Sequence, residues 1–75
     1  MNKERRNKVR AAVEMLKVAS EQLEKIKDDE EFAFDNMPEN LQYSQRGEDS
    51  QEAIDSLEEA IDGLEEVIDS LEGVL

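Results

Sequence analysis

The side chains of this sequence that could take part in catalysis or metal binding are the carboxylates of Asp and Glu. The 75 residues include 21 Asp and Glu but no cysteine and no histidine, which excludes disulfides, thiolate or imidazole metal sites and the usual nucleophile–base pairs. Two carboxylates can share acid–base work only when their environments differ, and a uniformly solvated acidic face provides no such difference. We therefore predict that the chain is not an enzyme, has no catalytic residues and binds no cofactor.

An acidic cluster at residues 28–31 is the one candidate for binding a metal ion. Together with Asp35 and, across a loop, Glu48 and Asp49, it could attract Ca²⁺ or Mg²⁺, because hard cations prefer oxygen ligands. No EF-hand spacing is present, and a solvated acidic helix end accounts for the same residues. We predict no metal site.

Charge is distributed unevenly along the chain. Residues 1–27 carry eight Lys and Arg against four Glu, residues 28–46 one Arg against six acids, and residues 47–75 eleven acids and no base, for a net charge of −12. A basic beginning and an acidic end are expected if the two ends lie side by side.

The basic beginning of the chain forms an arm that could touch phosphate, but the overall acidity and the scarcity of aromatic residues argue against direct nucleic-acid binding. This basic arm consists of Lys3, Arg5, Arg6, Lys8 and Arg10.

The first half of the chain has the pattern of a long amphipathic helix, which we predict over about residues 3–34. Apolar or small residues recur there at spacings of three and four, as in a heptad-like stripe. Further apolar residues flank this stripe, and a helix with two apolar sides usually contacts more than one neighbour. The stripe comprises Val9, Ala12, Leu16, Ala19, Leu23, Ile26, Glu30 and Ala33.

A loop is predicted over about residues 35–48, because Asn36 and Pro38 break the helical pattern. A short helical turn is expected near residues 38–42. The next helix could start after Ser44 as N-cap, or after Asp49 as N-cap with a capping box, and both starts stay open. The apolar side chains of this region are expected to fold back and close the end of the core; they are Phe32, Phe34, Met37, Leu41 and Tyr43.

The second helix, predicted over about residues 49–75, contains a repeat of seven residues. Residues 53–73 read AIDSLEE, AIDGLEE and VIDSLEG. So strict a heptad is typical of coiled-coil-like packing. The isoleucines take position a and the leucines position d, while the acids lie on the far side of the helix. Position g is occupied by Ala53, Ala60, Val67 and Val74.

These elements predict an all-α fold with a single domain over residues 1–75. A short loop joins neighbouring helices antiparallel, so we expect a two-helix hairpin with heptad packing. One partner helix does not cover so wide an apolar arc, and we expect two hairpins to form a homodimer with a four-helix bundle. A higher oligomer and a complex with another protein are the alternatives. The predicted core and oligomer-interface residues are Leu16, Leu23, Ile26, Ile54, Leu57, Ile61, Leu64, Ile68 and Leu71.

Two hypotheses for the function follow. The first is a non-enzymatic interaction or structural module that self-associates through its heptad stripe and offers its loop or acidic face to a protein partner. The alternative is an acidic inhibitor that imitates a phosphate backbone and occupies the groove of a nucleic-acid-processing protein. No apolar run suits a membrane span or a secretory signal, so we expect a cytoplasmic protein without membrane contact. The candidate acidic partner face is Asp55, Glu59, Asp62, Glu66 and Asp69.

The loop sequence also carries a resemblance. Residues 35–48 read DNMPENLQYSQRGE and are followed by the AIDSLEE heptads. This combination resembles a group of short, uncharacterised acidic proteins from Gram-positive bacteria and their phages and mobile elements, over most of the chain. The resemblance implies an all-helical hairpin and brings no catalytic residues with it. A phage setting would favour the inhibitor hypothesis by association.

Overall fold

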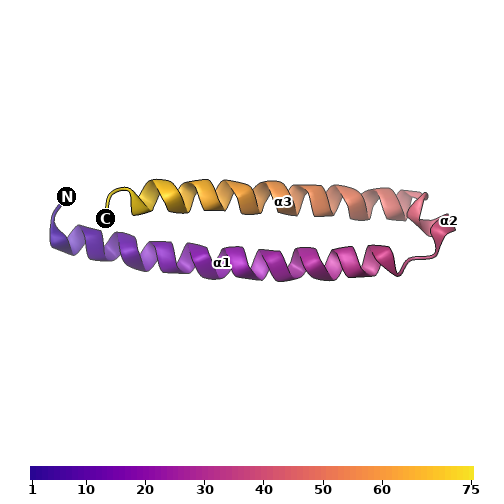
Figure 1. Cartoon of the computed structure of the whole chain (residues 1–75), viewed down its shortest axis with the longest axis horizontal. Helices are drawn as coiled ribbons and strands as arrows, with labels where there is room; N and C mark the ends of the chain where they lie inside the picture. The colour runs from indigo at the N-terminus through magenta and orange to yellow at the C-terminus, as the bar shows by residue number, and fades with distance from the viewer.

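The computed structural model describes all residues from 1 to 75 and consists of helices, which confirms the all-α prediction. Two long helices, α1 (Lys3–Asp35) and α3 (Gln45–Glu72), run antiparallel and pack against each other (Figure 1). A single-turn helix, α2 (Glu39–Gln42), lies at the corner between them. The hairpin is a rod of 58 × 14 × 12 Å, with both termini at the end away from α2.

The helix ends are defined by local hydrogen bonds. Asn2 caps α1, because its side-chain Oδ1 accepts a bond of 2.9 Å from the backbone N–H of Arg5. At the other end, the side-chain amide of Asn36 donates to the carbonyl of Phe32 at 2.8 Å. Helix α3 begins at Gln45 with Ser44 as its N-cap, four residues before the predicted start at 49. Of the two starts that the sequence left open, the structure therefore has the one at Ser44.

The core is a narrow seam between α1 and α3. On α3, the position-a residues Ile54, Ile61 and Ile68 are buried, and the position-d leucines beside them are half-buried. On α1, Val13 is the one buried residue, with 3% of its surface exposed. A seam this narrow is what two helices without further neighbours can form, since each helix buries only one stripe.

The stripe predicted for α1 is partly wrong. The side chains facing α3 repeat at alternating spacings of four and three from Val9 through Val13 to Phe34, whereas Ala12, Ile26 and Ala33 are exposed. The predicted stripe and the residues that face α3 share four members. The prediction therefore differs from the structure by a small rotation of α1 about its axis. Val13 and Phe34 are larger than the alanines beside them, and turning toward α3 lets them bury more apolar surface. The observed seam of α1 comprises Val9, Val13, Leu16, Ser20, Leu23, Lys27, Glu30 and Phe34.

The corner that joins the helices depends on Gly47. This glycine is buried in the first turn of α3, and a Cβ atom there would collide with the backbone of Gln42. Met37 and Leu41 are half-buried and close this end of the seam, as predicted from the sequence. Phe32 and Tyr43 are exposed, so the expectation that they join the closure was wrong.

Candidate functional site

The two sides of the α1–α3 seam differ in chemistry. In an antiparallel pair, the residues that precede each position a line one side of the seam, and those that follow each position d line the other. The first side of this hairpin is made of alanines, valines and one isoleucine, and we call it the apolar flank. Most of its side chains are exposed. The apolar flank consists of Ala12, Ala19, Ile26 and Ala33 on α1, Ala53, Ala60 and Val67 on α3, and Val74 in the turn just after α3.

An open groove of about 620 Å³ runs along the apolar flank. Its lining brings Ile26 and Ala33 of α1 together with Ala53 and Leu57 of α3. Ile26 has 52% of its surface exposed there, although the sequence placed it among the core and interface residues. Within the single chain, this side chain therefore lies at the rim of the seam rather than inside it.

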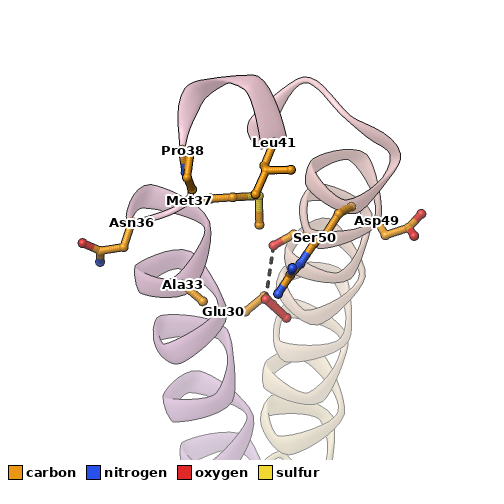
Figure 2. Close-up of a pocket in the computed structure, with 9 residues that line it drawn as sticks. Glu30, Ala33, Asn36, Met37, Pro38, Leu41, Asp49 and Ser50 are labelled. Carbon is orange, nitrogen blue, oxygen red and sulfur yellow. Dashed lines mark hydrogen bonds between the residues drawn. The ribbon is translucent and has the colours of Figure 1, made fainter.

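A second groove, of about 580 Å³, continues the first at the loop end of the hairpin (Figure 2). The two share Glu30 and Ala33 in their linings, so together they form one trough along the loop half of the apolar flank. Met37 and Leu41 cover the end of the trough, as Figure 2 shows, and Arg46 and Asp49 are also among its lining residues. We call this part the loop-end groove.

One polar contact joins the two helices inside the loop-end groove. The hydroxyl of Ser50 donates to a carboxylate oxygen of Glu30 at 3.2 Å, drawn as a dashed line in Figure 2. Ser50 is buried and Glu30 is half-buried, so the carboxylate keeps access to water. The spacing of apolar residues placed Glu30 on the stripe, but Ser50 was not predicted from the sequence. The heptad repeat could have predicted Ser50, because extending it seven residues back from Leu57 and Ile54 gives Ser50 and Gly47, both of which are buried.

The opposite side of the seam is polar, and one ion pair joins the two helices there. Lys17 and Glu72 form the one ion pair between the two helices, at 3.4 Å, and both side chains are more than two-fifths exposed. Exposed pairs of this kind contribute about 0–1 kcal/mol. Glu58 and Glu65 lie along the same side without a basic partner. Electrostatic pairing between the basic beginning and the acidic end of the chain is thus limited to a single contact.

The basic arm extends past the end of α3. Glu72, the last residue of α3, lies beside Lys17, so the first turns of α1 project beyond it, as Figure 1 shows. The arm's polar contacts stay within α1 or the N-terminus: Lys8 pairs with Glu4 at 3.6 Å and Arg10 donates to Asn7 at 2.9 Å. No acid of α3 forms an ion pair with this arm.

The acidic partner face predicted from the sequence lies in solvent on the outer side of α3. All five of its carboxylates are exposed, and none forms an ion pair. The structure contains no group of three or more acidic side chains placed to hold a metal ion, at residues 28–31 or elsewhere. The acidic face consists of Asp55, Glu59, Asp62, Glu66 and Asp69.

Comparisons with known proteins give no match. No protein-family model, no curated protein and no solved structure resembles the chain closely enough to count as a relative. Neither long helix has the uninterrupted apolar length needed to cross a membrane. The surfaces described above are therefore the basis for any functional inference.

Proposed function

We propose that this chain is a non-enzymatic helical interaction module that self-associates through its apolar flank. Two hairpins would share a core, with the trough along each flank filled by the other chain. The observation that carries the proposal is the row of aliphatic side chains that the hairpin leaves exposed along one side of the α1–α3 seam, where the other side is polar. An apolar row of this length on one face is typical of an interaction surface.

The exposed area of the chain supports this proposal. The hairpin exposes 5580 Å². A compact monomer of 8.6 kDa is expected to expose about 4,700 Å², so the hairpin has an excess of about 900 Å². Stable protein–protein interfaces bury about 800 Å² on each partner. Pairing two hairpins would therefore bring the exposed surface per chain to that of an ordinary compact protein.

A matched pair of substitutions tests the proposal. Ile26 and Val18 are β-branched residues of α1 with 52% and 53% of their surfaces exposed, but Ile26 lines the trough and Val18 lies on neither flank. We expect light scattering on a sizing column to give twice 8.6 kDa for the wild type and for Val18→Glu, and 8.6 kDa for Ile26→Glu. A monomeric wild type at micromolar concentration would refute self-association. Equal masses for the two variants would refute the apolar flank as its site.

A second candidate function is an acidic inhibitor of a nucleic-acid-processing protein. The observation that favours it is the acidic face, whose five carboxylates are exposed and unpaired over the fifteen residues from Asp55 to Asp69, a rise of about 21 Å along the helix. Free carboxylates in a row can imitate the charges of a phosphate backbone. If the chain belongs with the phage and mobile-element proteins that its loop sequence resembles, that origin would favour this candidate by association.

Charge reversal separates the two candidates. A variant with all five residues of the acidic face changed to lysine keeps the apolar flank, so a self-associating module should retain its mass in solution. An inhibitor should lose its effect in nuclease and polymerase assays that the wild type slows. Wild-type protein that slows none of a panel of such enzymes would remove the inhibitor from consideration.

A further inference from the structure

Charge is segregated along the length of the hairpin. The end that carries the chain termini bears the five cations of the basic arm, which extends beyond α3. The loop end bears acids on all three helices, including Glu30, Asp35, Glu39 and Asp49, with Arg46 as the one cation of the corner. The acids at the end of α3 also lie at the termini end, but the basic arm extends past them. The basic arm and the loop end of one molecule are therefore complementary in sign, but a rod of 58 Å keeps them apart.

Building on the self-association proposed above, we propose that the second copy lies antiparallel, with the two loops at opposite ends of the dimer. In this arrangement the basic arm of each chain lies beside the acidic loop end of the other. The partner's corner then covers the start of α1 that projects past α3, which would otherwise be exposed to solvent. Both apolar flanks face each other along the full length of the rods.

The basic side chain best placed to reach the partner's loop-end groove is Arg5. It lies seven residues before Ala12, so it continues the line of the apolar flank at its basic end. Its backbone N–H is used by the cap at Asn2, but its guanidinium has no partner within the chain. The loop-end groove lies at the other end of the same flank, and its lining residues include Glu30 and Asp49 as well as Arg46. The Asp49 carboxylate points outward and accepts from the side-chain amide of Gln45 at 2.7 Å, so Glu30 is the carboxylate that faces the groove. A guanidinium suits such a groove because it can bond two carboxylate oxygens at once.

A parallel dimer would place like charges together. The two basic arms would lie side by side at one end and the two acidic loop ends at the other. Both overhangs would then project at the same end, where neither is covered. Electrostatic complementarity sets the orientation of a complex more strongly than it sets affinity. The apolar flank thus favours association, and the charges select its direction.

The orientation can be measured directly, because the chain has no cysteine and a single introduced cysteine can be labelled. Asn40, exposed in α2 at the loop, is replaced by cysteine and coupled to a nitroxide. Pulsed dipolar electron spin resonance then measures the distance between the two loops of a dimer. The antiparallel dimer gives a distance near the 58 Å length of the hairpin. A parallel dimer gives less than about 25 Å, because neighbouring helices pack about 10 Å apart and the labels add their own length.

A charge reversal tests the contact itself. Arg5→Glu should raise the dimer dissociation constant about three- to tenfold. Arg10→Glu makes the same change in net charge but lies seven residues before Lys17, in line with the polar side, and should change the constant less than about twofold. Adding Asp49→Arg to Arg5→Glu should restore the wild-type value. The constants are measured by sedimentation equilibrium at low salt, where charge effects are least screened.

The outcomes separate this inference from the proposed function. A dimeric mass with a short distance between the loops overturns the antiparallel arrangement and leaves self-association standing. Equal effects of Arg5→Glu and Arg10→Glu overturn the arm-to-groove contact. A monomeric mass with no dipolar signal overturns self-association itself.

Discussion

Replacing Gly47 with alanine tests whether the corner of the hairpin is as tight as the structure indicates. Two effects of opposite sign compete. Alanine is preferred over glycine inside a helix by about 0.5–1 kcal/mol. Against this, the new Cβ would overlap the backbone of Gln42, which cannot move aside as the end of a flexible side chain can. Overpacking of this kind costs about 1–3 kcal/mol, and a clash with backbone lies toward the upper end.

We therefore expect Gly47→Ala to lose about 1–2 kcal/mol of unfolding free energy. Gly63→Ala is the matched control, because Gly63 also lies within α3 but a Cβ there meets nothing within 4 Å. The control should gain about 0.5–1 kcal/mol from helix propensity alone. The two variants should then differ by about 2–3 kcal/mol, or roughly 10–20 °C in melting temperature for a domain of this size.

The assay is urea and thermal unfolding followed by circular dichroism, with all variants at the same chain concentration, because association also contributes to stability. If Gly47→Ala proves as stable as Gly63→Ala, the close approach of α2 to α3 is wrong. The geometry of the loop-end groove would then have to be abandoned with it, since Leu41 of α2 helps to line that groove.

Three further predictions use the same unfolding assay. Val13→Ala should be about 1–2 kcal/mol less stable than Val18→Ala, because the same methyl groups are removed from a site that is 3% exposed and from one that is 53% exposed. Equal losses would contradict the burial of Val13 against α3. Lys17→Ala should change the unfolding free energy by less than about 1 kcal/mol, since both side chains of its pair with Glu72 are more than two-fifths exposed. A larger loss would mean that this ion pair holds the helices together. Raising the salt concentration at neutral pH should increase the melting temperature by at least about 4 °C. The like charges of the acidic face repel one another at spacings of three and four residues, and salt screens this repulsion. A flat or falling melting temperature would show that the repulsion is already neutralised.

The sequence by itself determined the helices and their order. A strict seven-residue repeat from Ala53 to Gly73 has no stable arrangement other than a helix with one apolar stripe, and the break at Asn36 and Pro38 separates it from the helix before. The isoleucines at position a are buried as the repeat predicted, because three evenly spaced β-branched residues define a single face. The acidic face followed from the same repeat.

Only the tertiary structure decided which side of α1 meets α3. Two overlapping stripes on α1 satisfy the same spacing rule, and the choice between them depends on the volume that Val13 and Phe34 fill against the opposing helix. The closeness of Gly47 to Gln42, the bond between Ser50 and Glu30, and the overhang of the basic arm likewise arise only when distant segments meet. Periodicity specifies which face of a helix is apolar to within about one residue, whereas the relative rotation and offset of two helices are set by how their side chains interlock.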